Sequence, residues 1–509
     1  MAFVFGKDSL NTQRLVELSS HPLKSISVDP PAKATLKKYR KIVDDAIDSK
    51  ETVYGINTGF GYLSHVDVEE TKLRQLQLNL IRSHACGVGP MLAPEISRGI
   101  LILRLHTFLS GHSGVSDNCV DIIVKFLEHD ILPVVPSQGS VGASGDLAPL
   151  AHIALGLIGE GQVFYQGKIV DVGELLGKLA IAPLIPQPKE GLSLINGTHV
   201  MTVLAAFAVE RAKVLVRSAD VITAMSLDAI CGTTVAFSEG IQALRPHPGQ
   251  QDVAANLRDL FADHDEILES HKDCKKVQDP YSFRCAPQVH GASRDMLAVV
   301  EKTVNIELNS MTDNPLCLED GSIVSGGNFH GQPIALVSDL LAMAMAEMGS
   351  ISERRIEKLI NPNMSGLPAF LTKNSGLESG FMIPHVVAAA IVSENKTLCH
   401  PASVDSIPTS ADKEDHVSMG TIAARKAQNV IKNVSRILAI ELLAACQGLD
   451  LLLPLKPNKR LLAVYDGLRS ISPGLTYDRS LSEDIEQVRC WIIDGNILRV
   501  LKKVKVELK

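Results

Sequence analysis

Apolar residues recur at helical spacing through the second half of the chain. The pattern predicts long helices over residues 200–230, 290–310, 334–360, 384–399 and 420–452. The last of these contains no internal proline and no break stronger than Gly448. Helices of this length exceed the globular average and usually pack into bundles, often shared between subunits.

The first 200 residues carry a mixed pattern. Helical periodicity covers residues 32–50, 68–83, 93–110 and 115–129. Gly161–Val170 predicts a pair of strands that turns at Gln166-Gly167. We therefore predict a mostly α protein, with a smaller mixed N-terminal domain over residues 1–200 and a bundle of long helices over residues 201–509.

Length and composition fit this division. A chain of 509 residues is too long for one core. Aromatic residues make up only 4% of the chain, so the core is expected to consist mainly of aliphatic side chains packed between helices. The mean hydropathy of +0.14 suggests surface buried between subunits. A net charge of −7 argues against binding of nucleic acid.

The cysteines and the N-terminal residues indicate in which cellular compartment the protein is expected. The nine cysteines are Cys86, Cys119, Cys231, Cys274, Cys285, Cys317, Cys399, Cys446 and Cys490. Their odd number and the lack of a C-x-x-C pair favour free thiols in a reducing compartment. Met1–Lys7 is too soon charged for a signal peptide, and no run of 18 apolar residues predicts a membrane span. We expect a cytoplasmic protein, without metal because no ligand cluster occurs.

The loop over residues 139–152 carries the most distinctive chemistry. Gly139, Gly142 and Gly145 are separated only by small residues, so the backbone can fold tightly on itself. In a tight turn, the amide nitrogen of Gly145 can close a five-membered ring on the carbonyl carbon of Ala143. Loss of water from the ring and from the Ser144 hydroxyl would leave a methylidene group, an electrophile that no standard side chain offers.

Two other interpretations of this loop fit less well. Phosphate binding lacks both glycine-rich fingerprints, and no Lys or Arg lies between Lys125 and Lys168. A hydrolase nucleophile elbow fails because Asp146 stands where G-x-S-x-G requires its second glycine. A plain turn remains the simplest alternative.

Four further polar clusters have both a functional and an ordinary interpretation. They are Tyr54–Gly61, Gln278–Gln288, Ser325–Gly331 and Asp412–Met419. The first two offer a phenol among glycines and a guanidinium suited to a carboxylate. The ordinary interpretations are a loop tyrosine and a solvated ion pair, and for the last two clusters helix capping and dipole compensation.

Taken together and in this order, the clusters resemble those of the aromatic amino acid ammonia-lyases. The string Ala143-Ser-Gly-Asp-Leu-Ala-Pro-Leu-Ala-His152 is similar to the signature of that family, and the resemblance covers nearly the whole chain. The family's electrophile is 4-methylidene-imidazol-5-one (MIO), built from Ala-Ser-Gly. The resemblance implies an ammonia-lyase/fumarase-like bundle of long helices and a homotetramer with active sites shared between subunits.

Within the family, Ser83-His84-Ala85 and Glu414–Met419 resemble the elements of lyases that act on histidine. This implies conversion of L-histidine to trans-urocanate and ammonia, without an external cofactor. By resemblance, the catalytic residues are Ala143, Ser144, Gly145, Tyr54, Tyr281 and Glu414. Substrate would be bound by His84, Asn196, Gln278, Arg284, Phe329 and Met382. A tyrosine lyase, an aminomutase and an inactive helical relative stay open as alternatives.

Overall fold

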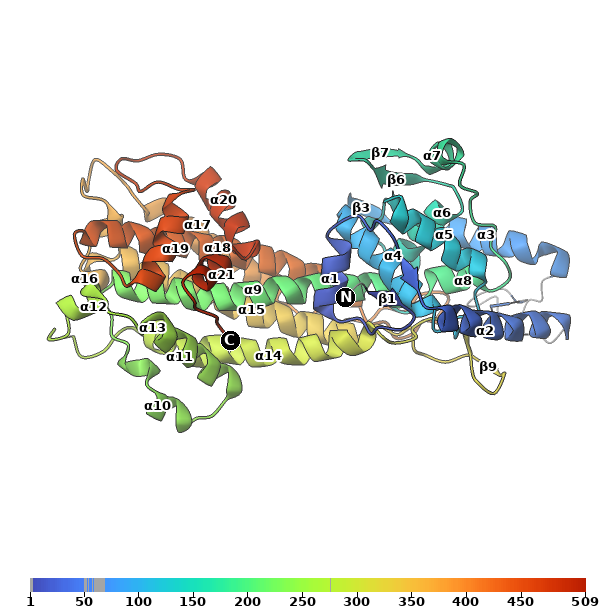
Figure 1. Ribbon diagram of the computed structural model, residues 1–509, viewed down its shortest axis with the longest axis horizontal. Helices are drawn as coiled ribbons and strands as arrows, with labels where there is room; N and C mark the ends of the chain where they lie inside the picture. Colours follow the sequence, from blue (N-terminus) through green and yellow to red (C-terminus); the bar gives the residue numbers. More distant parts are fainter. Residues whose placement is uncertain (1–2, 50–52, 54, 57, 59–68, 275) are drawn as a thin grey trace. The chain divides into compact units, whose positions relative to one another are not determined.

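The computed structural model describes residues 3–49, 53, 55–56, 58, 69–274 and 276–509 (Figure 1). They form two compact units. Unit 1 comprises Met1–Phe207, Glu301–Asp339 and Pro401–Arg425, and unit 2 comprises Ala208–Val300, Leu340–His400 and Lys426–Lys509. The expected division into residues 1–200 and 201–509 differs from these units, because two later segments pack with the first. Periodicity reports neighbours in sequence and cannot predict such returns of the chain.

The long helices predicted from periodicity are confirmed. They are α9 (His199–Ala229), α14 (Ala286–Glu307), α15 (Gln332–Ile360), α17 (Met382–Leu398) and α18 (Gly420–Leu452). Boundaries between the units fall inside α9, α14, α15 and α18. Apolar residues of these helices build the core, as in α18, where Val430, Val434 and Ile437 are fully buried.

Unit 1 also contains eight shorter helices among the described residues. They are α1 (Thr12–Ser19), α2 (Pro30–Asp48), α3 (Leu73–His84), α4 (Pro94–Phe108), α5 (Asp117–Glu128), α6 (Leu147–Leu157), α7 (Val172–Leu179) and α8 (Glu190–Ile195). Helices α2 to α5 match the predicted ranges, whereas α1, α6, α7 and α8 were not predicted. Helices α3, α6 and α8 pack against one another, and this packing positions the candidate site.

The described strands of unit 1 are short. They are β1 (Val4–Phe5), β2 (Ser27–Val28), β3 (Val88–Met91), β4 (Leu132–Pro133), β5 (Pro136–Gln138), β6 (Gln162–Tyr165), β7 (Lys168–Asp171), β8 (Leu316–Cys317) and β9 (Ile323–Val324). Strands β4, β6 and β7 form an antiparallel sheet in that order, β1 pairs with β2 in parallel, and β3–β5 and β8–β9 are antiparallel pairs. The predicted β6–β7 hairpin is confirmed, and it turns at Gln166 and Gly167, which both have positive φ.

Unit 2 adds short helices around its long ones. They are α10 (Glu239–Ala243), α11 (Pro248–Leu260), α12 (Glu266–Ser270), α13 (Tyr281–Arg284), α16 (Pro362–Ser365), α19 (Lys459–Arg469), α20 (Ser482–Ile493) and α21 (Asn496–Lys503). Within the described part of the chain, α15 is long and apolar enough to cross a membrane, yet 61% of its apolar window is buried inside the protein. Such burial is typical of a core helix.

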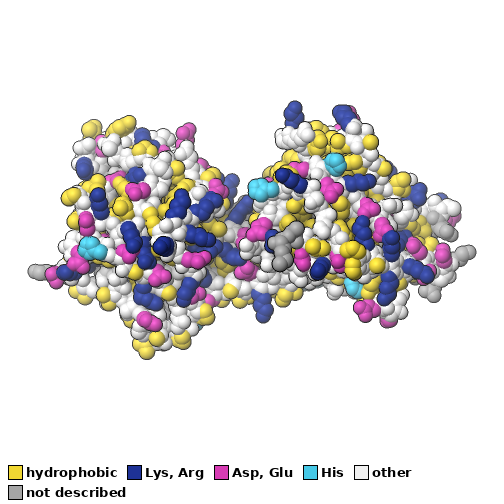
Figure 2. Space-filling model, in the orientation of Figure 1, with side chains coloured by type: hydrophobic (Ala, Val, Ile, Leu, Met, Phe, Trp, Pro, Cys, Tyr) yellow, Lys and Arg dark blue, Asp and Glu magenta, His cyan; other side chains and the backbone are white. Residues whose placement is uncertain are grey.

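Acidic and basic side chains are interspersed on the face drawn in Figure 2. This face therefore carries ions of both signs, as expected for a chain with 50 basic and 57 acidic residues.

Candidate active site

A cavity of about 660 Å³ opens in unit 1. Six of the residues singled out in the sequence belong to its walls or to the loop that forms one wall: His84, Ala143, Ser144, Asn196, Phe329 and Glu414. They come from α3, from the loop before α6, from the end of α8, and from the two segments that return to unit 1 late in the sequence. The fold therefore gathers residues that are more than 300 positions apart in the chain.

Other predicted site residues belong to unit 2. Gln278 and Arg284 line a second cavity, of about 630 Å³. Tyr281 is 70% exposed, and the guanidinium carbon of Arg284 lies 4.4 Å from the centre of its ring. Met382 begins α17 and is partly exposed. Tyr54, the predicted base, lies outside the described residues.

The loop before α6 has the tight backbone that its glycines suggest. Gly142 and Gly145 have φ of +68° and +72°, in the left-handed region that favours glycine. A Cβ atom on Gly145 would collide with the carbonyl group of Gly197. Gly145 forms a parallel bridge with Gly197, and the amide of Asp146 donates to the Gly197 carbonyl at 2.8 Å. Only glycine fits at position 145.

Ser144 is held at both its side chain and its carbonyl group. Its hydroxyl donates to Oε1 of Glu414 at 2.8 Å. Its carbonyl oxygen accepts hydrogen bonds from Nδ2 of Asn196 at 2.9 Å and from the amide of Gly197 at 3.4 Å. Two donors on one carbonyl oxygen stabilise negative charge that develops there.

Asp146 anchors the end of this loop. Its side chain is fully buried and accepts hydrogen bonds from the hydroxyls of Ser140 and Thr421 and from the amide of Met201. Burial raises the pKa of the Asp146 carboxyl, and these hydrogen bonds oppose the rise. The carboxylate thereby ties the loop to α9 and α18 at a point where the chain turns into α6.

Glu414 belongs to a strained turn, not to a helix cap. Thr409 and Glu414 pair as an antiparallel bridge, and between them Ser410, Ala411 and Asp412 all have positive φ. The second carboxylate oxygen of Glu414 accepts a hydrogen bond from the Thr409 hydroxyl at 2.6 Å. Helix α18 begins only at Gly420, and the carboxylate of Glu414 instead contacts two hydroxyl groups. Helix capping therefore does not explain this residue.

His84 closes another wall at the end of α3. Its Nδ1 lies 2.9 Å from the carbonyl oxygen of Leu80, which can only accept, so Nδ1 carries the proton. Burial lowers the pKa of the His84 imidazole, against the opposing effects of the Leu80 carbonyl and Glu414. The ring is thus neutral near pH 7, and its Nε2 is a hydrogen-bond acceptor.

Two histidines at this cavity were not among the predicted site residues. The rings of His330 and His416 stack with centroids 5.6 Å apart and planes 4° from parallel, and Nε2 of His330 donates to the carbonyl of His416 at 3.2 Å. Both histidines line the cavity. Each lies inside a cluster recognised in the sequence, but their pairing depends on the fold.

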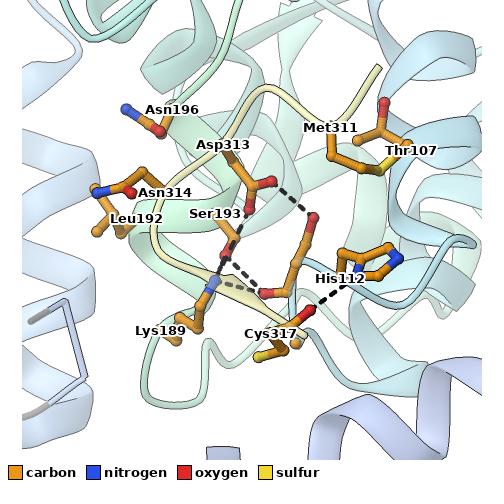
Figure 3. Close-up of polar contacts among 12 residues, drawn as sticks. Thr107, His112, Lys189, Leu192, Ser193, Asn196, Met311, Asp313, Asn314 and Cys317 are labelled. Carbon is orange, nitrogen blue, oxygen red and sulfur yellow. Dashed lines mark hydrogen bonds and ion pairs between the residues drawn. The ribbon is translucent and has the colours of Figure 1, made fainter. Parts of the chain in front are cut away.

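Residues of the short helix α8 line the cavity, and a buried lysine holds the start of this helix. Lys189 directly precedes the helix and is fully buried. Its ammonium group donates to the Ser113 carbonyl at 2.6 Å and to the Ser193 hydroxyl at 2.9 Å, and it lies 3.8 Å from Asp313 (Figure 3). Burial lowers the pKa of Lys189, while Asp313 opposes this effect. No periodic signal marks such residues in the sequence.

The fold and the site define a long-helix lyase of the ammonia-lyase type, whose Ala-Ser-Gly loop shares a cavity with a carboxylate and an imidazole. Residues 10–470 match the sequence profile of the family described as "Aromatic amino acid lyase". The chain belongs to this family, which places it among the carbon–nitrogen lyases.

Particular relatives narrow the comparison. The chain is 48% identical to the histidine ammonia-lyase of Myxococcus xanthus over 97% of both chains, and 51% identical to that of Sorangium cellulosum over 90% of both. The crystal structure of histidine ammonia-lyase from Trypanosoma cruzi superposes with a TM-score of 0.91 at 45% identity, over 98% of this chain and 95% of that one. A tyrosine aminomutase from Streptomyces globisporus superposes with a TM-score of 0.94 at 37% identity, over the full length of both.

Proposed function

We propose that this protein is a histidine ammonia-lyase that converts L-histidine to trans-urocanate and ammonia, the first step of histidine degradation. The observation that carries the proposal is the presence of Glu414 and His84 in the same cavity as Ser144. Relatives that share nearly half of their residues with this chain over almost its whole length support the same activity.

The substrate ring explains why these two residues belong together. A neutral imidazole carries one N–H donor and one acceptor nitrogen. The carboxylate of Glu414 and Nε2 of His84 both accept hydrogen bonds, so either can receive the N–H of the substrate ring. A phenyl ring has no N–H to donate, so it would leave unpaired the half-buried acceptor that the imidazole satisfies, at a cost of about 1–3 kcal/mol.

The Ala143-Ser144-Gly145 segment fits the formation of MIO. The left-handed φ of Gly145, the close approach to Gly197 and the low exposure of Ala143 hold the three residues in a compressed turn. When formed, MIO supplies an electrophile for the substrate amine. Dehydration of Ser144 also removes the hydroxyl that now binds Glu414, which leaves Oε1 of that carboxylate available to the substrate ring.

Further residues of the same cavity are suited to the rest of the substrate. Oδ1 of Asn196 is buried and has no hydrogen-bond partner among the described residues, so it can accept from the substrate's amino group. Phe329 supplies an apolar wall. Tyr54 is retained as the proposed base for the β-proton, on the strength of family resemblance alone.

We propose that Gln278, Tyr281, Arg284 and Met382 complete the active site of another copy in a homotetramer. Nε of Arg284 is buried without a partner among the described residues, and the exposed Tyr281 lies beside it. Exposed apolar residues also follow one another along α17: Met382, Ile383, Val386 and Val387. Such a face favours burial against another chain.

A cytoplasmic location is part of this proposal. It is supported by the burial of α15 within the protein, and by nine cysteines that form no disulfide in the structure.

Assays with L-histidine, L-tyrosine and L-phenylalanine test the proposed function. We expect urocanate absorbance and release of ammonia with L-histidine, at a kcat/KM far above the values for the other two amino acids. An aminomutase would instead convert tyrosine to its β-isomer without releasing ammonia. Turnover of tyrosine with no reaction of histidine would therefore contradict the proposal and favour the aminomutase alternative.

A further inference from the structure

Arg104 stands out among the buried residues of unit 1. It lies within α4, most of whose residues are buried, and its own side chain is fully buried. Placing a guanidinium in such surroundings is costly unless its N–H groups find partners, and an apolar side chain would cost less. Packing alone therefore gives no reason for an arginine at this position.

The hydrogen bonds of Arg104 lead directly to the candidate site. Its Nη1 donates to the carbonyl oxygen of Ser193 at 2.9 Å and to that of Asn196 at 3.1 Å. These carbonyl groups lie at the C-terminal end of α8, where a helix leaves its carbonyls without internal partners. Arg104 thus satisfies the end of α8 and fixes the backbone of Asn196.

The rest of the guanidinium is sparsely bound. Nε and Nη2 of Arg104 have no hydrogen-bond partner among the described residues, and its central carbon lies 5.3 Å from the ring centre of Phe108. Burial lowers the pKa of Arg104 to about 10, and Asp313 and Asp146 oppose the fall. The side chain therefore stays charged near neutral pH, and its direct hydrogen bonds are concentrated on the end of α8.

Asn196 transmits this constraint to Ser144. Its Nδ2 donates to the Ser144 carbonyl oxygen at 2.9 Å, beside the amide of Gly197. When the Gly145 nitrogen bonds to the Ala143 carbonyl carbon, the oxygen of Ala143 leaves as water with the N–H protons of Ser144 and Gly145. Ser144 then loses its Cα proton and its hydroxyl as a second water. Negative charge that develops in this elimination falls on the Ser144 carbonyl, which is the oxygen that Asn196 holds.

We propose that Arg104 is a positioning residue for the maturation of the active site. It holds Asn196 by its carbonyl group, and Asn196 in turn stabilises the Ser144 carbonyl while the ring forms. Arg104 itself does not line the cavity, and its hydrogen bonds go to Ser193 and Asn196 rather than to the three cyclising residues. The inference rests on the proposed function only in that MIO must form in this chain.

Intact-mass spectrometry of folded protein tests the inference, because each mature chain is lighter than its sequence by two water molecules. In Arg104→Met, the carbonyls of Ser193 and Asn196 lose their charged donor. We expect the fraction of dehydrated chains to fall about tenfold or more relative to wild type. Activity per dehydrated chain is measured alongside and is expected to fall less than the dehydrated fraction.

Arg98 provides a matched control on the same helix. It is 6% exposed, and it donates to the Ser19 carbonyl and to Asp130 rather than toward the site. Arg98→Met should lower the melting temperature yet leave folded chains fully dehydrated. A similar loss of dehydration in both variants would show a general effect of destabilising α4 and would overturn the inference.

The remaining outcomes are also decisive. Wild-type dehydration in folded Arg104→Met overturns the inference. If that variant does not fold, Arg104→Lys decides, because its single nitrogen cannot bind both carbonyls as well as the guanidinium does. A reduced dehydrated fraction in Arg104→Lys supports the inference, and a wild-type fraction overturns it. Absence of dehydration in the wild type would instead overturn the proposed function itself.

Discussion

Two networks of buried charge, one in each compact unit, are completed to different extents. In unit 2, the fully buried Glu441 accepts hydrogen bonds from Nε and Nη2 of Arg355, at 2.5 and 2.9 Å, and from the hydroxyls of Ser226 and Ser352. Both carboxylate oxygens are satisfied. In unit 1, by contrast, Arg104, Asp313 and Asn196 each keep a buried polar atom without a hydrogen-bond partner among the described residues.

We infer from this difference that the Arg355–Glu441 network of unit 2 has a structural role and that the network of unit 1 has a functional one. A saturated ion pair fixes how helices α15 and α18 pack and leaves nothing for a ligand. Incompletely bound groups are costly in a folded protein, and those of unit 1 are linked through Asn196 to the loop that is proposed to mature chemically. We therefore expect changes in the unit 2 network to affect stability and changes around Ser144 to affect activity.

The largest expected effect is on stability, from Arg355→Met in unit 2. Removing the guanidinium leaves Glu441 as an uncompensated buried charge, which should reduce the free energy of unfolding by about 3–5 kcal/mol. The double variant Arg355→Met/Glu441→Leu removes both charges and should recover most of this loss. Denaturant unfolding of the two variants checks the prediction, and an equal loss in both would show that the ion pair is not the cause.

A smaller but specific effect is expected from Glu414→Gln in unit 1. The amide keeps the shape of the side chain but lacks its charge, so kcat/KM for histidine should fall about 100-fold or more, while the melting temperature changes little. Asp412→Asn makes the same chemical change in the same turn, at a residue outside the cavity walls, and serves as the control. Equal activity losses in both variants would point to damage of the turn.

His84→Leu should alter substrate choice by about tenfold or more. The substitution removes an acceptor that a phenylalanine ring leaves unpaired, so the ratio of kcat/KM for histidine to that for phenylalanine should narrow. This ratio is independent of the amount of folded enzyme. An unchanged ratio would make His84 a structural residue and leave specificity to Glu414.

The smallest predicted effect is a dependence of stability on pH. Burial lowers the pKa of His199 well below its ordinary 6.5, and the nearby Arg104 lowers it further. Below pH 6.5 the unfolded chain therefore binds a proton that the folded chain refuses, so this residue's contribution to stability is lost as pH falls. The loss is up to about 1.4 kcal/mol per pH unit.

Melting curves at about pH 7.5 and pH 5.5 measure this effect when wild type is compared with a variant that has no titratable group at position 199. His199→Gln should flatten the dependence relative to wild type. In unit 2 burial also lowers the pKa of His290, but its ion pair with Asp220 opposes the fall. His290→Gln should therefore flatten the pH dependence of stability less than His199→Gln does. If His290→Gln flattened the pH dependence of the melting temperature more than His199→Gln, this prediction would be wrong.

Helices and tight turns could be predicted from the sequence because they depend on neighbouring residues. Contacts between segments that are distant in the sequence could not. The long helices follow from aliphatic periodicity, and the tight loop at Ser144 follows from its glycines. Membership of residues 301–339 and 401–425 in unit 1 depends on contacts across the fold. Helix capping was a reasonable interpretation of Glu414 until its turn was seen to bring the carboxylate to Ser144. Nothing in the sequence pattern marks Arg104 or Lys189 as buried, because charged side chains usually face solvent.

The most direct test of the account compares the intact masses of the wild type and Ser144→Ala. We predict that the wild type is lighter than its sequence by two water molecules and releases urocanate from L-histidine. Ser144→Ala, which has no hydroxyl to eliminate, should fold, lack the second dehydration and lose nearly all activity. A wild-type chain at its full sequence mass, or near-normal turnover by Ser144→Ala, would contradict the central claim.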